Sequence, residues 1–252
     1  MKLLALSDLH EEFAYLDRLG DVVRNARVEG VLFCGNVLRA EARQAEWQRA
    51  HAEGRGPRAD LPEVQKERSD DAQSITRFFR ALNQLGVPVF LVPGRNDAPE
   101  RFFLQAAFNS EIVEPHIHLV HRSFAPLGAG YVVVGFGGEI TSNERENEFF
   151  LRYPSWEAEF ALDFMRHLEQ EKILLTHTPP AENAEMAKDG RGAVSHIIKT
   201  YAPQFAVAAR ASGEKGKITV ANTVVVFPGR LANGDYAILD TKERSVAFGN
   251  LR

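Results

Sequence analysis

The stretch of sequence that decides the fold is residues 2–10, KLLALSDLH, a short apolar run that ends in a serine, an aspartate and a histidine. Its apolar part, residues 2–6, is too short for an ordinary globular helix and is typical of a strand buried on both faces. Similar short apolar runs recur at residues 31–34, 87–92, 131–134, 173–175 and 205–208. Together these runs predict a set of buried strands.

Stretches with helical spacing of hydrophobic residues lie between these runs, at residues 11–28, 70–85, 156–169 and 193–201. In the second stretch, Ile75, Phe79 and Leu82 fall on one face of a helix. An alternation of strands and helices is typical of parallel strands covered by helices. The C-terminal part differs, because Pro-Gly and Asn-Gly turns separate its predicted strands, which we expect to be antiparallel. These strands are predicted at residues 217–226, 236–240 and 245–248.

The chain shows no composition shift typical of a linker, so we predict a single domain over residues 1–252 with two sheets. Residues 39–71 are the exception, since they form a polar stretch rich in Arg, Glu and Ala, with Trp47 and a Gly-Arg-Gly-Pro break at 54–57. This composition predicts a polar helical insert. The insert is either a solvated scaffold or a lid or partner surface.

Composition and charge exclude several classes of partner and location. The 252 residues carry 30 Lys and Arg against 34 Asp and Glu, a net charge of -4, so non-specific binding of nucleic acid is not expected. Cys34 is the single cysteine and cannot form an internal disulfide, which favours a reducing compartment. Residues 3–6 are too short for a signal-peptide core, and no run is long enough to span a membrane. We therefore expect a cytoplasmic protein without a membrane partner. The sequence does not indicate its oligomeric state.

Polar motifs stand directly after four of the predicted strands. They are Asp8-Leu9-His10, Gly35-Asn36, Pro93 to Asp97, and Thr176 to Pro180. Because the carboxyl ends of parallel strands meet at one edge of a sheet, we expect these motifs to converge. An aspartate and a histidine two residues apart in an extended segment supply half of a metal site.

The order of these motifs resembles that of the calcineurin-like metallophosphoesterase superfamily: Asp-x-His, Gly-Asp, Gly-Asn-His-Asp, a later His, and Gly-His-x-His. The matching positions are Asp8-Leu9-His10, Gly35-Asn36, Gly94 to Asp97, and His177, and residues 225–240 look like the family's ending. The resemblance implies an α/β fold, a four-layer αββα sandwich of two mixed β-sheets flanked by helices. It also implies hydrolysis of phosphomonoesters or phosphodiesters.

The departures from the family pattern concern its metal ligands. Asn36 replaces the carboxylate that bridges two metals, and Arg95 replaces an asparagine ligand. Asn96 replaces the catalytic histidine, and the final histidine pair is missing, with Arg210 and Ser212 at its positions. The ligands that the resemblance leaves are Asp8, His10, Asn36 and His177. We therefore expect at most one divalent transition metal (Mn, Zn or Fe), and no two-metal centre.

Two hypotheses follow for the function. In the first, one metal at Asp8 and His10 activates water, and the catalytic candidates Arg95, Asn96, Asp97 and Arg210 act on a phosphate-containing small molecule, with the arginines neutralising its phosphoryl oxygens. In the second, the chain is a catalytically inactive relative that keeps the cleft as an anion-binding or partner-binding module. Arginines that bind phosphate must point into the cleft, whereas arginines that fill vacated metal positions should pair with Asp8 and Asp97.

Other polar residues have simpler interpretations. Glu139 follows a glycine-rich stretch after the strand at 131–134; it could replace a missing carboxylate ligand, although a tight turn also explains the glycines. His116, His118 and His121 resemble a metal cluster by composition only. The chain has no Walker lysine motif, no Gly-x-Ser-x-Gly and no Gly-x-Gly-x-x-Gly opening a helix. A nucleotide-binding protein or a serine hydrolase therefore has no support from the sequence.

Overall fold

The computed structural model describes residues 1–113, 115–128, 130–183 and 185–252, and in this part of the chain two six-stranded sheets carry the fold. The first sheet contains, in spatial order, β14 (Ser245–Asn250), β13 (Asp235–Asp240), β1 (Lys2–Leu6), β2 (Gly30–Phe33), β3 (Val89–Leu91) and β4 (Ile117–Leu119). The second contains β11 (Gly216–Val220), β12 (Thr223–Phe227), β10 (Phe205–Ala208), β9 (Glu171–Thr176), β6 (Tyr131–Phe136) and β5 (Ser123–Gly128). A short pair, β7 (Glu139–Thr141) and β8 (Arg152–Pro154), lies apart from both sheets.

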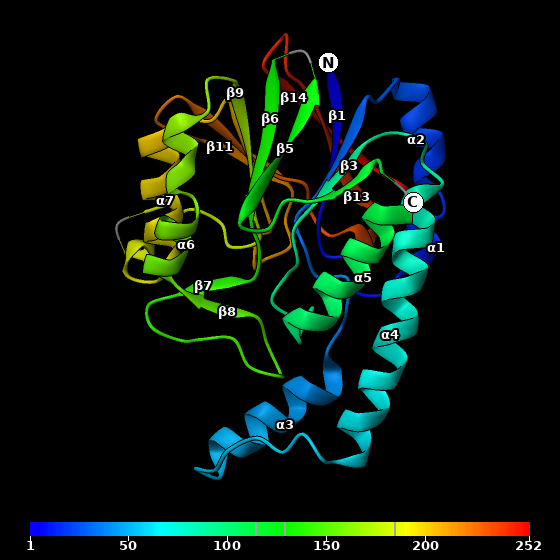
Figure 1. Cartoon of the computed structure of the whole chain (residues 1–252), viewed down its shortest axis with the longest axis vertical. Coiled ribbons are helices and arrows are strands. Elements are labelled where there is room, and N and C mark those ends of the chain that lie inside the picture. Colours follow the sequence, from blue (N-terminus) through cyan, green and yellow to red (C-terminus); the bar gives the residue numbers. More distant parts are fainter. Residues whose placement is uncertain (114, 129, 184) are drawn as a thin grey trace.

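Helices cover the outer faces of the two sheets (Figure 1). The first sheet is covered by α1 (Phe13–Leu16), α2 (Leu19–Ala26), α4 (Pro62–Asn83) and α5 (Glu100–Val113). The second is covered by α6 (Ser155–Ala161), the 3-10 turn η1 (Asp163–His167) and α7 (Gly190–Tyr201). The remaining helix, α3 (Glu41–Ala52), and two 3-10 turns, η2 (Met186–Lys188) and η3 (Leu231–Asn233), lie in connections. The four layers confirm the predicted αββα sandwich of two mixed sheets.

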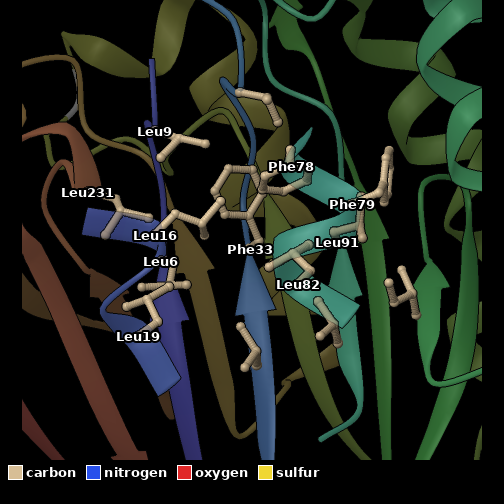
Figure 2. Packing of buried hydrophobic residues seen from close by; sticks show 14 of the residues in the cluster. Leu6, Leu9, Leu16, Leu19, Phe33, Phe78, Phe79, Leu82, Leu91 and Leu231 are labelled. Carbon is tan, nitrogen blue, oxygen red and sulfur yellow. The ribbon is translucent and has the colours of Figure 1, made fainter. Parts of the chain in front are cut away.

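The side chains of β1 show how one strand serves two hydrophobic layers. Leu4 and Leu6 pack under the helices in a cluster that includes Phe78, and Figure 2 shows Leu6 and Phe78 within it. Leu3 and Ala5 face the other way and pack between the two sheets. Since successive side chains of a strand point to opposite faces, a strand buried on both sides needs an unbroken apolar run. Residues 3–6 of β1 meet this requirement, and Lys2 at its start is exposed.

Parallel pairing dominates the centre of each sheet, as predicted. β1 pairs in parallel with β2, and β2 with β3; β10 pairs in parallel with β9, and β9 with β6. The C-terminal strands β13 and β14 are antiparallel additions to the first sheet, as expected. The expectation of one antiparallel strand at 217–226 is wrong. That stretch forms the β11–β12 hairpin, in which β12 pairs antiparallel with β11 and parallel with β10.

Helix boundaries differ most from the sequence predictions at three places. The stretch 11–28 contains the two short helices α1 and α2 instead of one. Helix α4 begins at Pro62, eight residues before the predicted start, and proline is favoured at the first position of a helix because it has no N–H to satisfy there. Helix α5 has no predicted counterpart, because Phe108, Ile112 and Val113 on it are exposed and blur its apolar stripe.

The predicted insert packs on the connection between β7 and β8. It contains α3 and the first part of α4, which extend beyond the sheets in Figure 1. Trp47 of α3 contacts Phe149 and Phe150, with ring centroids 6.0 and 5.4 Å apart. One face of the insert is therefore part of a hydrophobic cluster.

A buried arginine joins α3 to α4 and to the loop before α5. Arg43 is fully buried; its Nε donates to Glu67 Oε1 at 2.8 Å and its Nη2 to Asp71 Oδ2 at 2.8 Å. Its Nη1 donates to the carbonyl oxygen of Ala98 at 2.6 Å. A buried charge is tolerated only when it is paired and hydrogen-bonded in this way.

Asp71 gives this cluster a pH dependence. Burial raises the pKa of Asp71 to about 7; the charge of Arg43 opposes this rise and that of Glu67 adds to it. The folded state thus keeps a proton that the unfolded chain releases near pH 4, so Asp71 reduces stability as the pH rises from about 4 through about 7. Asp71→Asn cannot ionise and so lacks this loss, and we expect the stability of the variant minus that of the wild type to increase by up to about 4 kcal/mol as the pH rises over this range, in addition to a pH-independent change from altering the partner of Arg43.

Urea unfolding at pH 5 and pH 8 measures this difference. Asp70→Asn, which removes an exposed carboxylate from the same helix, is the matched control, and we expect it to change little between the two pH values. Parallel pH dependence of the wild type and Asp71→Asn would contradict the prediction.

The structure gives one observation on the single cysteine and one on membrane-spanning helices. Cys34 is buried between the sheets, where its Sγ donates to the carbonyl oxygen of Leu6 at 3.4 Å, as a structural thiol would. Within the described ranges, every helix is too short or too polar to cross a membrane.

Candidate functional site

A cavity of about 670 Å³ opens where the carboxyl ends of β1, β2, β9 and β10 meet, and we call it the cleft. Seven of the eight predicted site residues line it: Asp8, His10, Asn36, Arg95, Asn96, His177 and Arg210. The eighth, Asp97, is fully buried beside them. The four motifs converge as expected.

The first two motifs hold one another in place through their backbones. The Asp8 N–H donates to the carbonyl of Gly35 at 2.9 Å, and the His10 N–H donates to that of Asn36 at 3.1 Å. Asp8, His10 and Asn36 all have left-handed backbone conformations, with φ of 52°, 46° and 59°. Residues other than glycine adopt this region at a cost, and such strain concentrates at functional sites.

The buried carboxylate of Asp97 holds together the loops that follow β2 and β3. Its carboxylate accepts hydrogen bonds from the backbone N–H groups of Gly94 at 2.7 Å, Asn36 at 3.0 Å and Leu38 at 3.0 Å. Gly94 has to be glycine, since a Cβ there would lie 2.1 Å from the nitrogen of Asn36. Position 35 has to be glycine for the same reason, because a Cβ there would lie 2.4 Å from the Cα of Gly94. The third strand's loop is thus interlocked with the second strand's loop.

Both imidazoles have their orientation set by backbone carbonyls. His10 Nδ1 lies 3.2 Å from the carbonyl oxygen of Leu38, and His177 Nδ1 lies 2.8 Å from that of Cys34. A carbonyl only accepts, so Nδ1 carries the hydrogen in each ring and Nε2 of the neutral ring is an acceptor. Metal-ligating histidines usually have this arrangement, in which the second nitrogen donates to a carbonyl.

Asp8 is the buried anion of the cleft. Its Oδ1 lies 3.5 Å from His10 Nε2 and accepts from Asn36 Nδ2 at 2.9 Å. Burial raises the pKa of Asp8, but the hydrogen bond with His10, the charges of His177 and His10, and the Asn36 amide together hold it below its usual value. Burial lowers the pKa of His10, and the contact with Asp8 outweighs this and raises it.

The amide of Asn36 is oriented away from the role of a ligand. Its Oδ1 accepts the backbone N–H of Asn96 at 3.0 Å, which turns Nδ2 toward Asp8. An amide nitrogen donates hydrogen bonds and does not ligate a cation. In this arrangement, position 36 offers Asp8 a donor where the family pattern has a bridging carboxylate.

The arginines that the sequence singled out do not pair with Asp8 or Asp97, so the alternative in which they fill vacated metal positions has no support from these contacts. Arg95 Nε contacts Glu139 Oε2 at 3.0 Å, and Arg210 binds Glu182 through Nε at 3.0 Å and Nη2 at 2.8 Å. Glu139 begins β7, 44 positions from Arg95, and Glu182 lies in a loop 28 positions from Arg210. Arg95 and Arg210 of the cleft are therefore each paired with a glutamate.

Glu139 and Arg95 are held by further contacts. Arg152 Nε also donates to Glu139 Oε2, at 2.9 Å, so this carboxylate has two cationic partners. Arg95 stacks on Phe150 at 3.7 Å and donates from Nη1 to Gln44 Oε1 of α3 at 3.1 Å. Burial lowers the pKa of Arg95. The predicted insert thus reaches the cleft through Gln44.

Three arginines that line the cleft have no part in the sequence analysis: Arg152, Arg191 and Arg230. Arg230 directly follows the Pro228-Gly229 turn that matches the family's ending, and this position could have indicated it. Arg152 and Arg191 follow no motif. The three histidines at 116, 118 and 121 are not a metal cluster; His121, for example, accepts from the Gly137 N–H at 2.8 Å and contacts Glu100 at 3.1 Å.

Asp8 and His10 are the side chains of the cleft that could take part in holding a divalent ion. Among the described residues, no three His, Cys, Asp or Glu side chains are grouped so as to hold a metal. Asp8 and His10 still provide two adjacent donors, and Mg²⁺-like ions are commonly held by one or two carboxylates, water and a substrate phosphate. A closed four-ligand site of the structural zinc type does not fit these residues.

Comparisons with known proteins agree with this fold. One solved structure is 33% identical to the chain with a TM-score of 0.88, and covers 100% of this chain and 99% of its own. A protein of Thermus thermophilus is 28% identical with a TM-score of 0.82, at the same coverage of 100% and 99%. A dimetal phosphatase from Danio rerio shares the fold at 10% identity and a TM-score of 0.61, covering 94% of this chain and 91% of its own.

A comparison with curated proteins gives no match. The family model described as metallophosphoesterase, calcineurin superfamily, matches residues 1–251. Members of this superfamily generally bind divalent metals. The converging motifs, the two-sheet sandwich and this match lead to one conclusion: the chain belongs to the calcineurin superfamily of metallophosphoesterases.

Proposed function

We propose that the chain binds a phosphorylated small molecule in the cleft and hydrolyses its phosphoester with at most one divalent metal ion. The observation that carries the proposal is the state of the two imidazoles. His10 and His177 each bind a backbone carbonyl through Nδ1, and His10 Nε2 lies 3.5 Å from Oδ1 of the anionic Asp8, so a divalent ion bound by both of these atoms would replace the proton between them. A small molecule is favoured over nucleic acid because the net charge is -4.

Each of these side chains has a definite task in the proposed reaction. Asp8 and His10 would hold the ion, which when bound acts as a Lewis acid and lowers the pKa of water. His177 Nε2 is positioned to accept a proton at the wall of the cleft. Asp97 is a positioning residue, since its carboxylate is used by three backbone N–H groups. Asn96 donates from Nδ2 to the carbonyl of Arg39 at 2.9 Å and so is also a positioning residue.

A second candidate function, binding of a phosphoester without hydrolysis, is favoured by the amide of Asn36. Its Nδ2 donates to Asp8 Oδ1, the oxygen that also faces His10. A metal at Asp8 would have to compete with this hydrogen bond. The two candidates differ in metal binding and in turnover.

The test is to count metals in protein purified without chelator and then to measure hydrolysis of aryl phosphate and bis-aryl phosphate with Mn²⁺. We expect no more than one metal per chain and slow, metal-dependent hydrolysis. Asp8→Asn should lower the rate about 100-fold or more, because it removes the anionic ligand. Asp21→Asn, an exposed carboxylate on α2, is the control and should leave the rate unchanged.

The outcomes separate the two candidates. Hydrolysis that is equal in the wild type and Asp8→Asn would contradict the proposed mechanism. Binding of phosphate without hydrolysis of either substrate, whichever divalent metal is added, would support the second candidate. Two metals per chain at full occupancy would show that further residues had entered the coordination sphere and would overturn the one-metal limit.

A further inference from the structure

Arg230 differs from the other arginines of the cleft in its partners. Five arginines line the cleft, and Arg95, Arg152, Arg191 and Arg210 each contact a carboxylate. Among the described residues, the guanidinium of Arg230 instead donates from Nη2 to a neutral backbone carbonyl, that of Ala211, at 2.9 Å. Its positive charge is therefore not neutralised by a described acidic side chain, in contrast to its neighbours.

The backbone of Arg230 is fixed to the end of β1. The N–H of the next residue, Leu231, donates to the carbonyl of Ser7 at 2.8 Å, and that of Ala232 donates to the carbonyl of Asp8 at 3.0 Å. On the other side, the Ser7 hydroxyl donates to the carbonyl of Gly229 at 2.7 Å. These bonds fix the position of Arg230 relative to Asp8.

The side chain of Arg230 is also held over a glycine. A Cβ at Gly213 would lie 2.3 Å from Arg230 Nε and 2.8 Å from its Cζ. The guanidinium therefore lies against the Gly213 backbone, with Nη2 bonded to Ala211. A guanidinium has five N–H donors, and this contact uses one of them. Several donors remain for a ligand in the cleft.

We infer that Arg230 binds the phosphoryl group of the substrate in the cleft. An arginine with free donors recognises phosphate oxygens through paired, charge-assisted hydrogen bonds, and these are strongest when the side chain is preorganised. This inference rests on the proposed function. It assigns the anion contact to Arg230 in place of Arg95 and Arg210, which are already bound to Glu139 and Glu182.

The test uses inorganic phosphate and calorimetric titration of the full chain, in EDTA and again with Mn²⁺. Arg230→Gln should weaken phosphate binding by about 10-fold or more, since a hydrogen bond to a charged group is lost. Arg230→Lys keeps the charge and loses the fork, and should fall between the wild type and Arg230→Gln. Arg244→Gln, which removes an arginine that lies outside the cleft, should bind phosphate as the wild type does.

A second arm moves the side chain without changing the charge. Gly213→Ala forces Arg230 aside and should weaken phosphate binding. Gly213 has a φ of +73°, so its alanine variant is also strained. Gly86→Ala is the matched control, because Gly86 has a φ of +67° and nothing within 4 Å of an added Cβ. It should bind phosphate normally.

The results distinguish this inference from the proposed function. If the wild type binds phosphate and both Arg230→Gln and Gly213→Ala, shown to be folded by circular dichroism, bind it equally well, the role of Arg230 is overturned and the proposed function stands. If the wild type binds no phosphate in either condition, both fail. Weaker binding by Arg230→Gln and Gly213→Ala, with normal binding by the two controls, supports the inference.

Discussion

Arg43→Met is expected to lower the free energy of unfolding by about 3–5 kcal/mol, because it removes the cation from a buried pair and leaves Glu67 and Asp71 without it. In a chain of this size the change corresponds to a fall in Tm of about 10 °C. Methionine fills a similar volume, so the loss reports on charge and hydrogen bonding more than on a cavity. Thermal unfolding followed by circular dichroism measures it.

The control for this prediction is Arg49→Met on the same helix. Arg49 is half exposed and contacts Glu46 and Glu63 at 3.6 and 3.9 Å, so its loss should change Tm little. Equal effects of the two substitutions would show that the buried contacts of Arg43 contribute no more than surface ion pairs do.

Restoring the family's ligands is expected to create a second metal site and to raise hydrolysis with Mn²⁺ by about 100-fold or more. The restored positions are Asn36→Asp, Arg95→Asn, Asn96→His, Arg210→His and Ser212→His. The required loop remains at the cleft, since Ala209, Arg210 and Ala211 line it. A Mn²⁺ titration and the aryl phosphate assay measure the gain.

The single substitution Asn36→Asp is the informative control. It replaces the amide that donates to Asp8 by a second carboxylate, and two adjacent carboxylates repel each other unless a cation lies between them. We therefore expect Asn36→Asp to unfold at a lower temperature than the wild type in EDTA and to regain stability with Mn²⁺. A five-fold variant that folds but binds no second metal would show that residue 212 is not aligned with the family's histidine.

Local sequence patterns were sufficient to predict the parts of the fold that depend on local burial. Residues 2–6 and 31–34 are apolar because strands β1 and β2 are buried on both faces, and the residues that follow them converge because the strands are parallel. The hairpin of β11 and β12 was missed because its turn at residues 221–222 has no glycine or proline, and the alternation continues across it.

The charge partners in the cleft could not be predicted in this way. Glu139, at the start of β7, lies 44 positions from Arg95 in the sequence, and Glu182 lies 28 positions from Arg210. A single sequence shows which charges are present and gives no information on which loops approach each other. The same holds for Gln44, whose contact with Arg95 depends on how the insert folds back.

The hydrogen bonds of the Asp97 carboxylate allow the side chains at this edge of the sheet to change during evolution. It binds main-chain atoms of Gly94, Asn36 and Leu38, and main-chain atoms do not change when a side chain mutates. A lineage can therefore replace residues 36, 95 and 96 one after another, and pass through forms with different reactivity, without losing the backbone frame that carries them. This freedom does not extend to Gly35, Gly94 and Asp97. Whether a substitution in these loops is tolerated should therefore depend on its position more than on the chemical type of the new residue.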